Sequence, residues 1–276
     1  MCPVKSDAGY SLTKNVVGID IGSTSSKAVV FSDHNIRGWA IIPSGGNYRL
    51  AADEVLNIAL TKANITSDSI AYVVATGYGA ASVANVNGTV NDMTCQGRGI
   101  SYLLPSVRTV ADIGGQFSRV FRVDKEGRVF NFVFSEKCAA GSGRLLQVIA
   151  KVLQVDIDEL GELSLKSRNR VDFTTSCAVF MESELISRIA EGFLKEDIAA
   201  GIHRALAAKI QVLIERIGLE PDCALVGGGA RNIGLVRSIE EGLGTNVLIP
   251  EQPQIVAALG AALIAEEKAA KIQASQ

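Results

Sequence analysis

Two segments of the chain place apolar, β-branched residues on both sides of a short polar turn. Residues 16–31 read VVGIDIGSTSSKAVVF, and residues 108–123 read RTVADIGGQFSRVFRV. Apolar residues that flank a cluster of Gly, Ser and Thr predict a strand, a tight turn and a second strand. A further apolar segment follows each pair, at residues 36–42 and 127–135. The pattern therefore predicts two three-stranded units.

The two segments are copies of one frame, D-I-G-x-x-x-S-[K/R], followed by apolar residues. An internal repeat of this length indicates two related domains. On the repeat alone, we expect an N-terminal lobe at residues 1–109 and a C-terminal lobe at residues 110–276. The equivalent positions are Asp20 and Asp112, Gly22 and Gly114, Ser26 and Ser118, and Lys27 and Arg119.

Apolar residues recur at helical spacing between and after these units. They predict helices at residues 54–63, 143–153, 177–192 and 201–218, and a strand, glycine turn and helix over residues 223–243. The predicted fold class is α/β.

Composition narrows the range of partners. The 276 residues are 47% hydrophobic and 20% charged, with a net charge of −2 and no basic block, so neither nucleic acid nor an anionic membrane surface is favoured. The longest apolar run, residues 255–265, is too short for a membrane span, and the first residues lack an apolar signal core. We therefore expect a cytoplasmic protein that binds small molecules or other proteins.

The five cysteines are scattered, odd in number and without a C-x-x-C pair, which disfavours both a disulfide framework and a zinc ribbon. Cys138 precedes a helical pattern and Cys177 opens one, and helix N-termini suit an anionic group such as a [4Fe–4S] cluster with thiolate ligands. We interpret Cys95 and Cys223 as buried apolar residues and Cys2 as a tail thiol. His34 and His203 have no partner histidine at i+4, so surface or core roles are favoured over metal binding.

The two D-I-G turns are suited to binding phosphates. Backbone N–H groups and hydroxyls can cradle phosphate oxygens, and a carboxylate at the start of the turn can orient Mg²⁺ through water. A third glycine turn, LVGGGARN at residues 225–232, comes too late for a dinucleotide fingerprint, and no G-x-x-x-x-G-K-[ST] motif is present. The favoured interpretation is a nucleotide held between two lobes.

Seven motifs, in this order, carry a family resemblance: DIGSTSSK, ATGYG, DIGGQ, EKCAAGSGR, SCAVFMESE, LVGGGARN and PQIVAALGAAL. They resemble the activators of 2-hydroxyacyl-CoA dehydratases and the ATPase subunits of benzoyl-CoA reductases, over nearly the whole chain after about residue 15. The resemblance implies two duplicated actin-like ATPase lobes, of the ribonuclease H-like kind, with a nucleotide cleft between them. It also implies a homodimer with one [4Fe–4S] cluster at its interface, bound by Cys138 and Cys177 of both chains.

The same resemblance implies a function. Hydrolysis of ATP with Mg²⁺ would drive an electron from a ferredoxin or flavodoxin to a low-potential iron–sulfur partner enzyme. One position departs from the family, because activators commonly carry an aspartate after DIGGQ where this chain has Phe117. The partner could be a dehydratase, a benzoyl-CoA reductase core or a double-cubane cluster protein, and the sequence does not choose among them.

The turns and the resemblance together predict the site residues. We expect catalytic roles for Asp20, Asp112 and Gln116. Glu184, on a predicted helix with an acidic face, is expected to turn toward the nucleotide. The other predicted nucleotide-binding residues are Gly22, Ser23, Thr24, Ser25, Lys27, Gly114, Gly115, Gly141, Ser142, Gly143, Gly227, Gly228, Gly229, Ala230, Asn232 and Gln254.

Two other classes of function stay open at the level of the sequence. A small-molecule kinase of the same superfamily would need a catalytic carboxylate beside a substrate hydroxyl, and nothing marks a sugar site. A nucleotide-gated binding protein would share the clamp but would leave Cys138 and Cys177 without a role.

Overall fold

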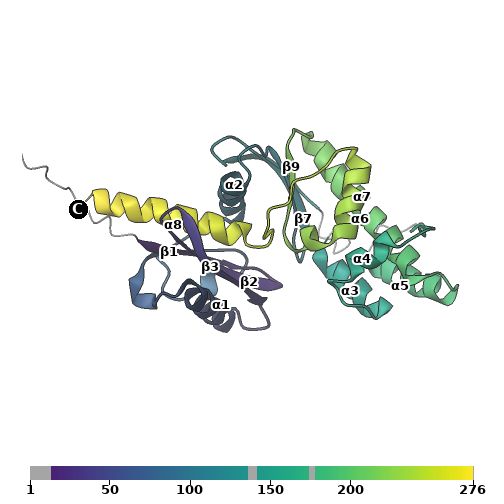
Figure 1. Ribbon diagram of the computed structural model, residues 1–276, viewed down its shortest axis with the longest axis horizontal. Coiled ribbons are helices and arrows are strands. Elements are labelled where there is room, and N and C mark those ends of the chain that lie inside the picture. The colour runs from purple at the N-terminus through teal and green to yellow at the C-terminus, as the bar shows by residue number, and fades with distance from the viewer. Residues whose placement is uncertain (1–13, 136–141, 174–177, 276) are drawn as a thin grey trace, which may run out of the picture.

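The computed structural model describes residues 14–135, 142–173 and 178–275, and it contains two sheets with helices packed against them (Figure 1). The first sheet has the strand order β3-β2-β1-β4-β5, and the second has the order β8-β7-β6-β9. The strands of the first sheet are β1 (Asn15–Ile21), β2 (Ser25–Ser32), β3 (Asn35–Pro43), β4 (Ile70–Thr76) and β5 (Gly88–Thr89). Those of the second are β6 (Thr109–Ile113), β7 (Ser118–Val123), β8 (Val129–Phe134) and β9 (Cys223–Val226).

The repeat in the sequence is a repeat in the topology. Strand β1 pairs antiparallel with β2 and parallel with β4, and β6 pairs in the same way with β7 and β9. The registers also match, since Asp20 lies opposite Lys27 and Asp112 lies opposite Arg119. The two predicted three-stranded units are therefore confirmed.

Helices cover both faces of the first sheet. Successive side chains of a strand point to opposite faces, so Val16 packs in one core with helix α8 (Val256–Ala274) and Val17 packs in another with helix α1 (Tyr48–Ala63). Short 3₁₀ turns lie at Ser67–Ser69 and Ala80–Ser82. Burial on both faces explains why β1 and β2 have nearly continuous apolar sequences instead of alternating ones.

The second sheet is covered in the same manner. Its first core contains the buried residues of α3 (Gly143–Leu153), α6 (Lys195–Ile217) and α7 (Ile233–Leu243). Helices α4 (Leu160–Leu165) and α5 (Ala178–Ala190) add Leu160, Met181 and Leu185 to it. On the other face, helix α2 (Asp92–Leu103) contributes Ile100 to a core with Phe121 and Val256. The expected helices are present, and α1 and α6 each begin six residues before their predicted starts, whereas α2, α4 and α8 were not predicted.

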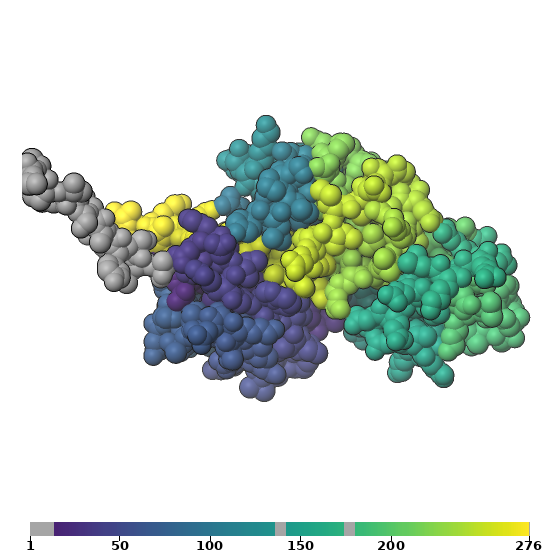
Figure 2. Space-filling view, viewed as in Figure 1, coloured from purple at the N-terminus to yellow at the C-terminus, as the bar shows by residue number. Residues whose placement is uncertain are grey.

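Helices α2 and α8 cross closely between the two sheets. A Cβ atom on Gly99 would collide with the carbonyl oxygen of Val256, and one on Gly260 would collide with that of Cys95. Helix α8 thus packs on the first sheet, although the predicted boundary assigns it to the second lobe. In the view of Figure 2 the first strands partly cover this helix. The division at residues 109 and 110 stays a prediction. Within the described ranges, no helix is long and apolar enough to cross a membrane.

Candidate nucleotide site

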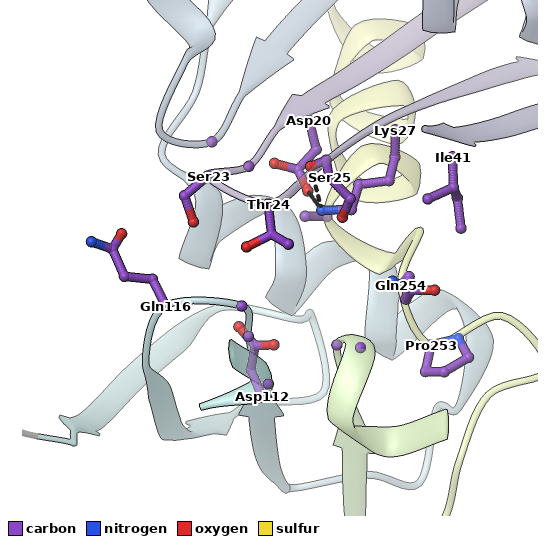
Figure 3. Close-up of a pocket in the computed structure, with 18 of the residues that line it drawn as sticks. Asp20, Ser23, Thr24, Ser25, Lys27, Ile41, Asp112, Gln116, Pro253 and Gln254 are labelled. Carbon is purple, nitrogen blue, oxygen red and sulfur yellow. Dashed lines mark hydrogen bonds and ion pairs between the residues drawn. The ribbon is translucent and has the colours of Figure 1, made fainter. Parts of the chain in front are cut away.

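A cavity of about 750 Å³ lies between the two sheets, where the β1–β2 and β6–β7 turns face each other (Figure 3). The turns are in close contact, because a Cβ atom on Gly115 would come within 2.8 Å of Thr24 Cβ. Loops that follow the parallel strands β4 and β9 supply two more parts of the wall, including Gly77 and Gly227. The volume is within the range of small-molecule sites.

The first turn places a carboxylate beside an ammonium group. Lys27 Nζ donates to Asp20 Oδ2 and to the carbonyl oxygen of Ser25, each at 3.1 Å. Burial raises the pKa of Asp20, and the charge and hydrogen bond of Lys27 oppose that rise. Two hydrogen bonds close the turn. Gly22 N–H donates to the carbonyl oxygen of Ser25 at 3.1 Å, and the Ser44 hydroxyl donates to the carbonyl oxygen of Gly22 at 2.6 Å.

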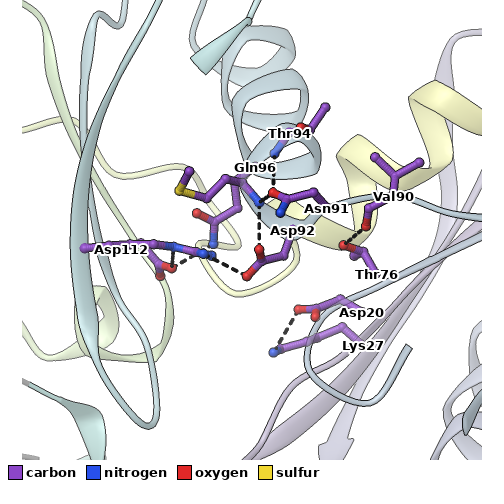
Figure 4. Close-up of polar contacts among 11 residues, drawn as sticks. Asp20, Lys27, Thr76, Val90, Asn91, Asp92, Thr94, Gln96 and Asp112 are labelled. Carbon is purple, nitrogen blue, oxygen red and sulfur yellow. Dashed lines mark hydrogen bonds and ion pairs between the residues drawn. The ribbon is translucent and has the colours of Figure 1, made fainter. Parts of the chain in front are cut away.

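The second turn places Asp112 in a denser network. Asp112 Oδ2 accepts hydrogen bonds from Arg119 Nε at 2.9 Å and from Gln96 Nε2 at 2.8 Å, and Arg119 Nη1 reaches Asp92 Oδ2 at 2.7 Å (Figure 4). Burial alone would lower the pKa of Arg119, but Asp112 and Asp92 outweigh it and the pKa is raised. Asp112 is therefore held by two donors, Arg119 and Gln96, whereas Asp20 is held by Lys27.

Two glycines bring the parallel strands close to these carboxylates. Gly77 follows β4 with φ of 87°, and Gly227 follows β9 with φ of 84°, a region that favours glycine. A Cβ atom on Gly227 would lie 2.5 Å from Asp112 Oδ1, and one on Gly77 would be closer still to Asp20 Oδ1. The ATGYG segment is thus the first-lobe equivalent of the VGGGARN turn.

Most of the predicted nucleotide residues line the cavity. Ala230 instead belongs to the core that α3, α6 and α7 form on the second sheet, Gly229 lies next to Ile113 of that core, and Ser142 is the buried N-cap of α3. The predicted residues that line it are Asp20, Gly22, Ser23, Thr24, Ser25, Lys27, Asp112, Gly114, Gly115, Gln116, Gly143, Gly227, Gly228, Asn232 and Gln254.

Two further predicted residues, Glu184 and Gly143, make contacts within the protein. Glu184 forms an ion pair with Arg188 on α5 at 3.4 Å and is not among the lining residues, so its contact with a nucleotide stays a prediction. The first N–H groups of α3 are also occupied, because Gly143 and Arg144 donate to the carbonyl oxygens of Gly114 and Gly115 at 2.8 and 3.1 Å. Gly143 therefore lines the cavity and also supports the second turn through its N–H group.

Three predicted site residues, Gly141, Cys138 and Cys177, lie outside the described residues. Cys95 and Cys223 are buried, and burial raises the pKa of each thiol to about 12. Their interpretation as buried apolar residues is confirmed.

The cavity fits Mg²⁺ held mainly by phosphates. No group of three His, Cys, Asp or Glu side chains that could hold a metal ion occurs in the part of the chain that the structure describes. Asp20 and Asp112 both reach the cavity, and Mg²⁺ characteristically keeps water and substrate phosphates with one or two carboxylates. Either aspartate could orient that ion.

Sequence reasoning did not identify Asp92 and Gln96 as site residues. Both are on α2, four positions apart, which places them on one face of the helix. A signal was present at the start of that helix, since Asn91 is an N-cap whose side chain accepts from Met93 N–H at 2.9 Å. Arg119 and Lys27 also occupy equivalent positions of the repeat, each opposite an aspartate on the neighbouring strand. This equivalence could have predicted a cation beside Asp112.

Several known proteins resemble this chain over most of its length. The sequence profile of the BadF/BadG/BcrA/BcrD ATPase family matches residues 17–265. The 2-hydroxyisocaproyl-CoA dehydratase activator of Clostridioides difficile is 39% identical over 257 residues, which are 93% of this chain and 97% of that protein. A benzoyl-CoA reductase component of Thauera aromatica is 31% identical over 258 residues, covering 89% of this chain and 91% of the relative.

Solved structures agree with these matches. The activator of the 2-hydroxyisocaproyl-CoA dehydratase from Clostridium difficile with bound ADPNP superposes with a TM-score of 0.91 at 38% identity, covering 95% of this chain and 98% of that one. A ROK family glucokinase from Streptomyces griseus, at 13% identity and a TM-score of 0.58 over 92% of this chain and 99% of that one, shares the fold alone. The predicted actin-like ATPase fold is confirmed.

Proposed function

Because the chain belongs to the BadF/BadG/BcrA/BcrD ATPase family, we propose that it is an ATP-dependent electron-transfer activator. In this proposal a homodimer holds one [4Fe–4S] cluster and couples ATP hydrolysis to the one-electron reduction of an iron–sulfur partner enzyme. The observation that carries the proposal is the pair of equivalent carboxylate turns, at Asp20 and Asp112, on opposite walls of one cavity.

Residues of both lobes bind the nucleotide. The N–H groups and hydroxyls at Ser23, Thr24 and Ser25 cradle the phosphates from one side, and the glycine turn at Gly114 and Gly115 does so from the other. Asp20 and Asp112 orient Mg²⁺ and water, with Gln116 as a third polar group in the same turn. Lys27, only 12% exposed at its side chain, compensates phosphate charge.

The two cysteines outside the described residues are the proposed cluster ligands. Four thiolates bind a [4Fe–4S] cluster, so Cys138 and Cys177 of one chain and of a second copy would complete one set across a two-fold axis. Cys95 and Cys223 are buried in the cores of one chain, which disfavours them as ligands shared between two chains. When bound, the cluster would carry the single electron.

Electron transfer to the partner requires that nucleotide binding favours one arrangement of the lobes over another. A ligand shifts such an equilibrium only through its different affinity for the two states. The cavity is lined by turns of both sheets and by residues of α2 and α8, so closure around ATP would move one sheet relative to the other. A 2-hydroxyacyl-CoA dehydratase is the favoured partner, since the relative named as an activator is 39% identical and the benzoyl-CoA reductase component is 31% identical. A ferredoxin or flavodoxin would supply the electron.

The test uses the full chain, purified without oxygen. Hydrolysis of Mg·ATP is measured first, and then the rate at which the iron chelator bathophenanthroline removes iron in the presence of Mg·ADP or of a non-hydrolysable ATP analogue. The proposal expects hydrolysis, bound iron and different removal rates in the two nucleotide states. Equal rates would contradict the coupling, and protein that neither hydrolyses ATP nor contains iron would contradict the function.

A further inference from the structure

Asp92 lines the nucleotide cavity, but the proposed nucleotide roles leave it unexplained. It is the first residue of helix α2, and its side chain is 34% exposed. Both carboxylate oxygens are engaged within the protein. Oδ1 accepts from Met93 N–H at 2.9 Å, and Oδ2 accepts from Arg119 Nη1 at 2.7 Å (Figure 4). The carboxylate is therefore held in place by its own helix, and it binds a residue of strand β7.

Arg119 connects Asp92 to the carboxylate of Asp112. Its Nε donates to Asp112 Oδ2 at 2.9 Å while Nη1 donates to Asp92, and the side chain is only 5% exposed. A guanidinium group is planar, always charged and donates in fixed directions. Two carboxylates on neighbouring edges of the group therefore fix its plane, and that plane fixes the direction of the bond to Asp112.

The two donors to Asp112 bind the same oxygen. Oδ2 accepts from Arg119 and from Gln96, whereas Oδ1 accepts no hydrogen bond within the described part of the chain and is not among the fully buried unpaired atoms there. Asp20 has the same division, since Lys27 binds its Oδ2 and the described residues offer no donor to its Oδ1. Figure 3 shows both carboxylates at the cavity. In each aspartate, Oδ2 is thus the anchored oxygen and Oδ1 is available to a water.

The first lobe indicates why Arg119 needs a second anchor. Lys27, its equivalent, is anchored inside its own turn, because Nζ donates to the carbonyl oxygen of Ser25 as well as to the neighbouring aspartate. The second turn has Phe117 at the position of Ser25, and the ring centroid lies 6.0 Å from Cζ of Arg119. The longer guanidinium side chain takes its second anchor from helix α2 instead, through Asp92.

We propose that Asp92 is a positioning residue for ATP hydrolysis, which holds Arg119 so that Arg119 holds Asp112 Oδ2 and Oδ1 faces the hydrolytic water. This role rests on the proposed function of Asp112 and adds the helix that orients it. Asp92 acts through Arg119 and needs no contact with the nucleotide. A catalytic group displaced by about 1 Å costs on the order of 100-fold in rate. Loss of this support should therefore lower kcat, while the glycine turns still bind the nucleotide.

The test measures ATP hydrolysis by the full chain. Asp92→Asn keeps the size of the side chain and removes its charge. We expect kcat to fall about 10- to 100-fold, the usual effect of losing a group that orients an active-site residue, with KM for Mg·ATP within about threefold of wild type. Asp92→Glu restores the charge and should recover most of kcat. Glu196→Gln is the matched control, because Glu196 is also an acidic residue in the first turn of a helix, α6, but does not line the cavity. It should change neither quantity.

Arg119→Lys tests the route by which Asp92 acts. Lysine keeps a cation opposite Asp112, as Lys27 does in the first lobe, but it lacks the second arm that reaches Asp92. Its loss of kcat should therefore agree within about threefold with that of Asp92→Asn, and the double variant should be no more than about threefold worse than either.

Several results would overturn the positioning role. One is a fall of kcat in Asp92→Asn of less than about tenfold, or a fall accompanied by an equal rise in KM. Another is a double variant in which the two losses multiply, or a far larger loss in Arg119→Lys alone, because Asp92 would then act independently of Arg119. An equal loss in Glu196→Gln would attribute the effect to the helix terminus. If Asp92→Asn does not fold, Asp92→Ser replaces it in the same cycle. Wild-type protein without hydrolysis refutes the proposed function itself, whereas an unchanged kcat in Asp92→Asn refutes the positioning role alone.

Discussion

Gly227 lies so close to Asp112 that a Cβ atom on it would come within 2.5 Å of the carboxylate Oδ1. The equivalent glycine of the first lobe, Gly77, has the same relationship to Asp20, and both have positive φ angles. The duplicated site thus depends on two glycines as much as on two carboxylates.

Gly227→Ala is therefore expected to disable hydrolysis. The added methyl group must displace the Asp112 carboxylate, and a displacement of about 1 Å at a catalytic group costs on the order of 100-fold in rate. The measurement is kcat for ATP hydrolysis of the purified variant. Gly244→Ala is the control, because Gly244 also has a positive φ, of 66°, but nothing lies within 4 Å of its added Cβ. Equal losses in both variants would attribute the effect to backbone strain instead of displacement.

The two aspartates should differ in their contribution to stability. Asp20→Ala and Asp112→Ala are both expected to abolish hydrolysis, but Asp112 also holds two donors, and Arg119 is only 5% exposed at its side chain. Removing one partner of a buried ion pair costs about 3–5 kcal/mol, and Asp92 retains part of the pairing, so we expect Asp112→Ala to lose about 2 kcal/mol more than Asp20→Ala. Urea unfolding followed by circular dichroism measures the difference. A larger loss for Asp20→Ala would contradict the asymmetry.

The sequence predicts the duplicated strands well because their pattern is local. The apolar residues of 16–31 and 108–123 and the turns between them fix both hairpins, and the register that sets Asp112 against Arg119 follows from the turn length. The phosphate turns are predicted for the same reason.

Helix α2 is missed because its features depend on long-range contacts. Its sequence, DMTCQGRGISYL, contains two glycines, which lower helix propensity. One of them, Gly99, is explained by the crossing with Val256 of α8, a residue more than 150 positions away. Gln96 and Asp92 are missed with the helix that carries them. The placement of α8 on the first sheet has the same cause.

A buried histidine should make the second lobe sensitive to acid. Ser164 Oγ donates to the carbonyl oxygen of Gly161 at 2.7 Å, so the 2.9 Å contact to His203 places a proton on Nδ1 and leaves Nε2 without one. Burial lowers the pKa of His203 from 6.5 to about 4. The unfolded chain thus binds a proton at higher pH than the folded chain, and stability that is complete above pH 6.5 is lost as the pH falls toward 4.

The expected loss from this histidine is about 3 kcal/mol across that window, since one pKa unit is 1.36 kcal/mol. His203→Gln, which can still donate to Ser164, should flatten the dependence of the unfolding free energy on pH between 6.5 and 4 by this amount. His34→Gln is the control, because His34 is exposed in a turn beside Glu266. Parallel curves for His203→Gln and wild type would contradict the assignment.

Iron content separates the proposed ligands from the other cysteines. A cluster of four irons shared by two chains gives about two irons per chain in protein prepared without oxygen. Cys138→Ala and Cys177→Ala should each lose all of the iron, since either change removes two of four ligands from the dimer. Cys95→Ala and Cys223→Ala, which alter buried thiols with a pKa of about 12, should lose none.

Sedimentation should show the dimer loosened only in Cys138→Ala and Cys177→Ala, because part of the association would run through the iron. Four irons per chain in a monomer, or a full complement of iron in Cys138→Ala or Cys177→Ala, would contradict a shared cluster.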